Sequence, residues 1–243
     1  MSTPTKSLRG VVLAGGSGSR LLPLTRTTNK HLLPVGTKPM IYYPIERLRG
    51  AGIRDILVVT GVSHMGEVVN QLGSGADFSC RFTYKVQDQA GGIAQALGLA
   101  EEFAAGGSLA VILGDNIFED DLSPYVRQFQ ESGKGAMILL KEVADPRRFG
   151  VAQLEGKAIA RIVEKPAQPP SNFAVTGVYF YDARVHGIIR SLQPSARGEL
   201  EITDVNNRYL EMGELAHGFL KGYWTDAGTH ESLRRANELV GHE

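Results

Sequence analysis

Residues 11–35 read VVLAGGSGSRLLPLTRTTNKHLLPV, an apolar run that enters a glycine-rich turn and continues to Arg20 and Lys30. Three glycines within residues 15–18 permit positive φ angles and let backbone N–H groups approach an anion without interference from a Cβ. The arginine adds a planar charged fork that suits phosphate oxygens. The stretch predicts a strand that ends in an anion-binding loop. A tight turn with two solvated basic residues would fit these residues alone equally well.

Known loop motifs do not match this stretch. A dinucleotide-binding fingerprint needs Gly-x-Gly-x-x-Gly, but Leu21 stands where the third glycine belongs. A P-loop needs Gly-x4-Gly-Lys-Ser/Thr, and the chain has no such run. The nucleophile elbow Gly-x-Ser-x-Gly is also absent, since Gly61 and Gly66 are one residue too far apart. The loop therefore belongs to another design.

Short apolar runs alternate with helical patterns along most of the chain. Runs that predict strands cover residues 10–13, 56–60, 82–86, 109–113 and 136–142, and amphipathic segments cover 40–51, 64–72, 93–104 and 122–132. Strand–helix–strand order implies parallel pairing with helices on both faces. Beyond residue 149, strand patterns at 151–154, 159–163 and 175–181 predict an antiparallel or mixed extension, with helices at 184–191, 203–212 and 231–240. We expect a Rossmann-like α/β fold with a mixed, mostly parallel central sheet and an inserted β region.

Composition narrows the class of partner and the compartment. Lys and Arg total 26 and balance 26 Asp and Glu, so the bulk charge argues against nucleic acid or an anionic membrane as a partner. The single cysteine, Cys80, excludes an internal disulfide and fits a reducing compartment. The N-terminal residues MSTPTKSLRG lack the apolar core of a signal peptide. We expect a cytoplasmic protein.

A wider set of motifs resembles one family of enzymes. LAGGSGSR (13–20), NKHLLPV (29–35) and KPMIYYPI (38–45) resemble the sugar-1-phosphate nucleotidylyltransferases, also called sugar-nucleotide pyrophosphorylases. Their glucose-1-phosphate thymidylyltransferase subgroup is the most similar. That subgroup also accounts, in collinear order, for VQDQAGGIAQA (86–96), LGDN (113–116), RFGV (148–151), EKP (164–166), AVTGVYFYD (174–182), GELEITDVN (198–206) and WTDAGTHESL (224–233).

The resemblance implies a reaction and an organisation of the chain. A glucose 1-phosphate oxygen would attack the α-phosphorus of dTTP with Mg²⁺ as cofactor, giving dTDP-glucose and pyrophosphate. Residues 1–243 would form one domain, with a nucleotide-binding half at about 8–116 and a sugar-binding half at about 117–243, and the chain would form a homo-oligomer. Alternatives are a UTP-dependent uridylyltransferase, a thymidylyltransferase for another hexose 1-phosphate, or a non-catalytic regulatory domain.

Two polyanions meet in such a reaction, so the site needs cations and metal-binding carboxylates. Asp115 follows the apolar run 109–113, at the strand end where open α/β sheets bind ligands. By resemblance, Asp115 and Asp226 hold Mg²⁺, and Arg20, Lys30 and Asp115 are catalytic. Without a metal, Asp115 would cap a turn with its neighbour and Asp226 would begin a helix. The nucleotide-binding residues implied are Leu13, Gly15, Gly16, Ser17, Gly18, Ser19, Gln87, Gly92 and Asp115.

Specificity would come from the base and sugar pockets. The amide of Gln87 offers a donor and an acceptor, which match O4 and N3–H of thymine or uracil and mismatch cytosine. The residues implied for sugar phosphate are Gly150, Glu164, Lys165, Val175, Tyr179 and Trp224. Tyr179 could equally belong to the core.

Some positions depart from the family pattern or favour structure over catalysis. His31 replaces the usual glutamine, and we interpret it as a neutral hydrogen-bonding substitute. Phe149 replaces a frequent tyrosine and loses its hydroxyl. Thr203 beside the acidic residues at 199, 201 and 204 predicts the N-cap of a helix rather than a catalytic cluster.

Overall fold

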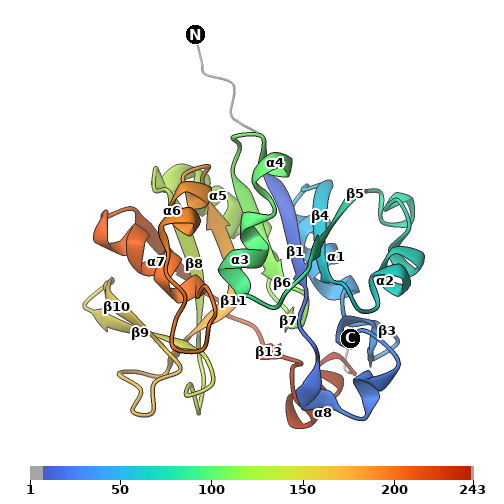
Figure 1. The fold of residues 1–243 in the computed structure, drawn as a ribbon. Coiled ribbons are helices and arrows are strands. Elements are labelled where there is room, and N and C mark those ends of the chain that lie inside the picture. Colours follow the sequence, from blue (N-terminus) through green and yellow to red (C-terminus); the bar gives the residue numbers. More distant parts are fainter. Residues whose placement is uncertain (1–7, 242–243) are drawn as a thin grey trace.

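Figure 1 shows the computed structural model, in which residues 8–241 are described. Most of the N-terminal stretch on which the expected location rests falls on residues 1–7 and so lies outside the described residues. Within 8–241, no helix is both long enough and apolar enough to cross a membrane.

A nine-stranded mixed sheet forms the centre of the fold. Its first half is parallel: β1 (Arg9–Ala14) lies between β4 (Asp55–Gly61) and β6 (Leu109–Leu113), and β5 (Arg81–Gln87) pairs with β4. β11 (Phe173–Tyr181) continues the sheet antiparallel to β6. The expected mixed, mostly parallel α/β fold is therefore confirmed.

The second half of the sheet is mostly antiparallel. β8 (Ala136–Glu142) pairs with β11 in antiparallel fashion and with β12 (Leu215–Phe219) in parallel. The hairpin of β9 (Gly150–Glu155) and β10 (Ala158–Glu164) joins the sheet through β11. For residues 136–142 the expected parallel pairing is wrong where β8 meets β11. The reason is that β11 runs antiparallel to both β6 and β8.

Helices cover both faces, and the alternation of strand residues explains why. Val11 and Leu13 of β1 point into one core with α3 (Ile93–Gly98), α6 (Val185–Ser191) and α7 (Ile202–Glu211). Val12 and Ala14 point into the opposite core. That core packs against α1 (Tyr42–Gly50), α2 (Met65–Leu72) and α5 (Ser123–Ser132). The helix expected over 93–104 is interrupted, since α3 ends at Gly98 and the short α4 (Glu101–Ala104) follows.

Two short strands that the sequence pattern missed bring the end of the chain back to the sheet. β7 (Asn116–Phe118) directly follows β6 and pairs antiparallel with β13 (Trp224–Asp226), so that Asp226 lies opposite Asn116. α8 (His230–Val240) then packs beside the segment after β1 (Figure 1). His230 Nε2 lies 2.8 Å from the Leu22 carbonyl oxygen in that segment. A separate two-stranded antiparallel sheet, formed by β2 (Pro34–Val35) and β3 (Lys38–Pro39), lies beside α8.

Candidate active site

A cavity of ≈ 730 Å³ opens at the carboxyl ends of β1 and β6. Its lining includes every residue predicted for the site except Ser17, Gly18 and Ser19. Beyond Gly16 the chain enters a tight turn: Gly18 adopts a left-handed conformation just before the short 3-10 helix η1 (Ser19–Leu21), and Thr25 Oγ1 donates to the Gly18 carbonyl. The carboxyl ends of parallel strands are where open α/β sheets bind their ligands.

The glycines of the loop are required by its shape. Gly16 has φ +92° and Gly18 has φ +63°, the positive values that the sequence led us to expect. A Cβ on Gly15 would lie 2.8 Å from Gln87 Oε1, and a Cβ on Gly18 would lie 2.9 Å from Thr25 Cγ2. Larger residues at these positions would therefore displace their neighbours.

Asp115 stands at the centre of the charged part of the cavity. Lys30 Nζ donates to its Oδ2 at 2.7 Å, and both side chains are largely buried. Burial alone would raise the pKa of Asp115, but the nearby charge and hydrogen bond of Lys30 hold it well below its usual range. Lys30, the cation predicted to act beside Asp115, therefore favours the ionised form of this carboxylate.

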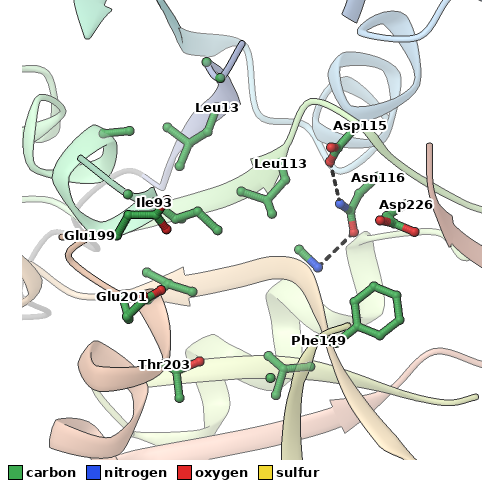
Figure 2. Close-up of a pocket in the computed structure, with 18 of the residues that line it drawn as sticks. Leu13, Ile93, Leu113, Asp115, Asn116, Phe149, Glu199, Glu201, Thr203 and Asp226 are labelled. Atoms are coloured by element: carbon green, nitrogen blue, oxygen red, sulfur yellow. Dashed lines mark hydrogen bonds between the residues drawn. The ribbon is translucent and has the colours of Figure 1, made fainter. Parts of the chain in front are cut away.

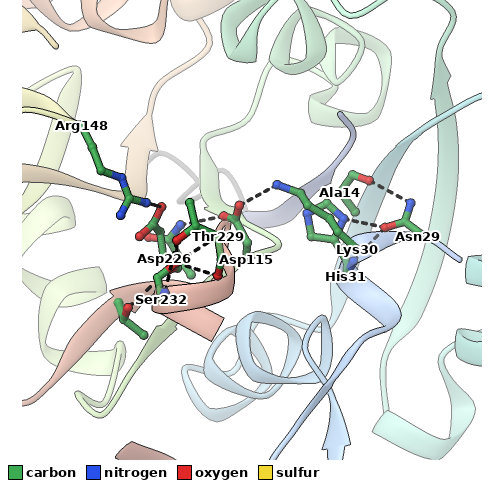
Figure 3. Close-up of polar contacts among 11 residues, drawn as sticks. Ala14, Asn29, Lys30, His31, Asp115, Arg148, Asp226, Thr229 and Ser232 are labelled. Carbon is green, nitrogen blue, oxygen red and sulfur yellow. Dashed lines mark hydrogen bonds and ion pairs between the residues drawn. The ribbon is translucent and has the colours of Figure 1, made fainter. Parts of the chain in front are cut away.

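Asp226 reaches the same place from the other end of the chain, through the β7–β13 pair. Arg148 Nη2 donates to its Oδ2 at 2.7 Å (Figure 3). Burial and the charge of Asp115 raise the pKa of Asp226 to about 6, although Arg148 partly opposes the shift. The helix-start alternative for Asp226 is wrong, because Thr229 is the N-cap of α8 and forms a capping box with Ser232.

The charged side chains of Arg20, Asp115 and Asp226 all lie close to Gly228. A Cβ built on it would lie 3.4 Å from Arg20 Nη2, 3.4 Å from Asp226 Oδ2 and 3.6 Å from Asp115 Oδ2. Among residues 8–241 no cluster of three or more His, Cys, Asp or Glu side chains could hold a metal. Two carboxylates alone are nevertheless sufficient for Mg²⁺, which is commonly held by one or two carboxylates together with phosphate oxygens and water. The residues present fit that ion.

Asn116 connects the two sides of the cavity, and sequence reasoning gave it no role beyond a turn. It is 2 % exposed, and its Nδ2 donates to Asp115 Oδ1 at 3.0 Å. Its Oδ1 accepts hydrogen bonds from Trp224 Nε1 at 2.7 Å and from the backbone N–H of Gly177 at 2.9 Å. A buried amide with these partners fixes Asp115 relative to Trp224, a residue predicted to face the sugar.

Gln87 occupies the uncharged part of the cavity. It is 8 % exposed, and its Nε2 donates to Gln95 Oε1 at 2.7 Å and to the Gly92 carbonyl at 3.2 Å. The expectation that the amide presents both a donor and an acceptor to a base is therefore wrong, because the protein itself uses the donor. The acceptor Oε1 remains on the side of Gly15.

The residues predicted for the sugar gather around Glu164. Thr203 Oγ1 donates to Glu164 Oε2 at 2.6 Å, while Lys165 Nζ lies 3.3 Å from Glu164 Oε1. The predicted N-cap role of Thr203 is wrong, since Glu201 is the N-cap of α7 and the Thr203 hydroxyl serves Glu164. Arg197, which sequence reasoning missed, pairs with Glu201 at 2.8 Å and lines the cavity. Figure 2 shows Glu201 and Thr203 across the cavity from Asp115.

Aromatic side chains form part of the wall. Phe149 lies edge-on to Trp224 with ring centroids 5.0 Å apart. Tyr179 is only 3 % exposed and stacks on Tyr181, so most of its ring belongs to the core although it also lines the cavity. Burial raises the pKa of its hydroxyl, which therefore stays protonated.

His31 is buried beside Lys30. Its Nδ1 lies 2.7 Å from Asn29 Oδ1, and Asn29 also accepts from the His31 backbone N–H (Figure 3). Burial, with the Lys30 charge, lowers the pKa of His31 from 6.5 to about 3. The ring is neutral at physiological pH, as the sequence interpretation expected.

Comparison with known proteins defines the class to which this fold and site belong. Residues 9–243 match the family described as nucleotidyl transferase, and the chain belongs to that family. Within it, the chain is similar to glucose-1-phosphate thymidylyltransferases. The enzyme of that name from Neisseria gonorrhoeae is 47% identical over 237 residues, which cover 96% of this chain and 82% of the relative. The one from Xanthomonas campestris strain B100 is 45% identical, over 96% of this chain and 80% of the relative. The resemblance seen in the sequence motifs is thus confirmed.

Solved structures agree with this placement. A Bacillus anthracis structure described as a glucose-1-phosphate thymidylyltransferase in complex with a sucrose superposes with a TM-score of 0.93 at 56% identity, over 96% of this chain and 95% of that chain. A UDP-glucose pyrophosphorylase complexed with UDP-glucose superposes with a TM-score of 0.85 at 26% identity, over 97% of this chain and 99% of that chain.

Proposed function

We propose that this protein transfers a thymidylyl group from dTTP to glucose 1-phosphate, giving dTDP-glucose and pyrophosphate. The names of its relatives support the substrates. The observation that carries the chemistry is the convergence of Arg20, Asp115 and Asp226 around Gly228, with Lys30 paired to Asp115. These groups are suited to bringing two phosphorylated substrates together.

The reaction is an in-line displacement at phosphorus. A phosphate oxygen of the sugar forms a bond to the α-phosphorus of the triphosphate, and the bond from that phosphorus to the bridging oxygen breaks with release of pyrophosphate. Arg20 stabilises the charge on the departing pyrophosphate. Lys30, fixed by Asp115, balances charge beside the α-phosphate and the sugar phosphate. The glycine loop lets the triphosphate approach the backbone closely.

Asp115 and Asp226 would hold the Mg²⁺ that this family of reactions calls for. The ion supplies positive charge to the phosphate oxygens and helps to orient them. The chain contributes the second carboxylate through β13, and the Asn116 hydrogen bond keeps the first one oriented. Arg148 Nη2 donates to the Asp226 carboxylate at 2.7 Å and partly balances its charge.

The two halves of the chain divide the substrates between them. Residues 8–116 supply the triphosphate and base contacts, and residues 117–243 supply the sugar contacts. Glu164 accepts from glucose hydroxyls, and Lys165 reaches the 1-phosphate. Backbone groups of Gly150 and Val175 and the ring of Trp224 complete that pocket, whose lining they form.

A pyrophosphate-release assay tests the proposal. Purified protein with Mg²⁺ and glucose 1-phosphate is given dTTP, UTP, dCTP or dATP in turn. We expect rapid release with dTTP, slower release with UTP and little with the other two. The absence of pyrophosphate with every triphosphate would overturn the proposed function, and a clear preference for UTP would replace it with uridylyl transfer.

A further inference from the structure

Gln95, on the first helical turns after the Gly91–Gly92 corner, hydrogen-bonds to the side chain of Gln87 without itself lining the cavity. Its Oε1 accepts two hydrogen bonds, from the backbone N–H of Gly91 at 3.1 Å and from Gln87 Nε2 at 2.7 Å. A Cβ on Gly91 would lie 2.5 Å from Gln95 Cδ, so the absence of a side chain there lets Gln95 fold back over the corner.

These contacts leave Gln87 only one amide orientation. The Gly91 N–H donates to the Gln89 carbonyl at 2.8 Å and is shared with Gln95 at 3.1 Å. A backbone N–H can only donate, so the Gln95 atom that faces it is the oxygen. That oxygen and the Gly92 carbonyl are both acceptors, so the Gln87 atom facing them must be the nitrogen. A reversed Gln87 amide would set its oxygen against two other oxygens. Gln87 Oε1 consequently points to the other side, toward Gly15, and no donor among residues 8–241 hydrogen-bonds to it.

The corner is also anchored from the sugar-binding half of the chain. The backbone N–H of Leu200 donates to the Gly91 carbonyl at 2.8 Å, and the Leu200 carbonyl accepts from the Ala94 N–H at 3.2 Å. A Cβ on Gly92, whose φ is +99°, would collide with the Leu200 carbonyl oxygen. The backbone that sets the orientation of Gln95 is therefore held by hydrogen bonds to Leu200, in a segment much later in the chain.

We propose that Gln95 is a positioning residue that fixes the Gln87 amide with its oxygen toward the ligand, so that the cavity selects a pyrimidine carrying a hydrogen at N3. The proposal rests on the proposed function for the identity of the nucleotide. Thymine and uracil donate from N3–H to an acceptor. Cytosine presents a lone pair at N3, which would face the lone pairs of Gln87 Oε1. Rejection then comes from an acceptor held in place, and a glutamine free to rotate would lose it.

Two substitutions separate this role from a merely structural one. Gln95→Met keeps the length of the side chain but removes the shorter of the two hydrogen bonds from Gln87 Nε2. Only the Gly92 carbonyl then opposes a reversed amide, so the Gln87 nitrogen can be offered to cytosine at a lower cost than in wild type. Gln95→Glu keeps an acceptor oxygen for both Gly91 N–H and Gln87 Nε2 and is the matched control. Equilibrium binding of dTTP and of dCTP is measured by calorimetry for wild type and both variants, and kcat and KM are measured for each nucleotide with glucose 1-phosphate.

We expect the preference for dTTP over dCTP to fall about tenfold in Gln95→Met, the effect of one hydrogen bond of ordinary strength. The change should appear in Kd and KM, with kcat for dTTP unchanged, and Gln95→Glu should keep the wild-type preference. An unchanged preference in Gln95→Met, or an equal loss in Gln95→Glu, would overturn the inference, as would a wild-type protein that binds the two nucleotides equally. A wild-type protein that binds dTTP selectively yet releases no pyrophosphate would contradict the proposed function alone.

Discussion

The two ends of the cavity are built from different kinds of interaction. The phosphate end, formed by Arg20, Lys30, Asp115, Arg148 and Asp226, contains charges close enough to shift each other's proton affinity. The end proposed for the base contains the neutral side chain of Gln87, which Gln95, behind the cavity wall, and the Gly91–Gly92 corner hold through hydrogen bonds of fixed direction. Charges act on the barrier of the reaction, whereas oriented neutral groups decide which ligand fits. Changes at the first end should therefore alter rate, and changes at the second should alter selectivity.

Even within the phosphate end the two carboxylates differ. Asp115 has its charge matched by Lys30, whereas Asp226 is left with a pKa raised to about 6 despite its pair with Arg148. An additional cation at this point would match the unbalanced charge.

The largest expected effect is that of Asp226→Asn. Removing the charge while keeping the shape should lower kcat by about 10³-fold, since charge stabilisation at the reacting phosphates is lost. Pyrophosphate release measures the rate, and circular dichroism shows whether the fold is kept. Asp77→Asn, the same exchange at an exposed position outside the cavity lining, is the control. Activity within tenfold of wild type would remove Asp226 from the catalytic centre.

Gly228→Ala tests the convergence point itself. The added methyl would make ordinary van der Waals contact, at 3.4–3.6 Å, with one guanidinium nitrogen and two carboxylate oxygens. The fold should therefore survive, but the methyl would take space between Asp115 and Asp226. We expect the Mg²⁺ concentration for half-maximal activity to rise about 10–100-fold, the range for disturbing the surroundings of a metal site.

Gly222 is unsuitable as a control for Gly228→Ala because a Cβ there would collide with Glu119. Gly133→Ala, in open space, tests the general effect of the exchange but carries the strain of its φ of +64°. An unchanged Mg²⁺ requirement would contradict a cation at this point.

The parts of this arrangement that the sequence predicted are those with strong local patterns. Long apolar strands and the LAGGSGSR loop have their own periodicity and turn chemistry, so β1, β4, β5 and β6 were predicted within one or two residues. β7 and β13 have three residues each, too few to show an alternation, so the pairing that delivers Asp226 was not predicted. Asp226 itself was found only because its motif resembles a family.

Side-chain partners were the least predictable feature. Arg148 and Gln95 lie within motifs that the resemblance covers, yet nothing in their local sequence shows that one meets Asp226 and the other Gln87. Thr203 followed a sound local rule for helix caps, but a longer-range contact with Glu164 took its hydroxyl. Local rules describe what a residue can do, and the tertiary fold decides which of these possibilities is realised.

His31 differs from the charged side chains around it at the phosphate end of the cavity, because its own side chain is neutral. Its pKa falls from 6.5 in the unfolded chain to about 3 in the fold, so between these values the unfolded state binds more protons. Stability should therefore be lost as the pH falls below 6.5. His31→Gln cannot titrate, and between pH 7.5 and pH 5.0 wild type should lose about 2 kcal/mol more unfolding free energy than this variant. Urea denaturation at both pH values gives the difference. The same exchange at the exposed His230 is the matched control, and equal losses in wild type and His31→Gln would show that the ring is not held neutral.

Arg148→Gln should have the smallest effect, and in the opposite direction to Gly228→Ala. Arg148 is partly exposed and competes with an incoming cation for Asp226, to which it donates at 2.7 Å. A partly exposed ion pair is worth about 0.2–1 kcal/mol, so its removal should lower the Mg²⁺ concentration for half-maximal binding of dTTP by a factor of about 1.4 to 5. Arg147→Gln is the matched control, because Arg147 also lines the cavity but pairs with Asp145. A higher Mg²⁺ requirement in Arg148→Gln would contradict this competition and would mean that Arg148, like Arg20 and Lys30, assists ligand binding directly.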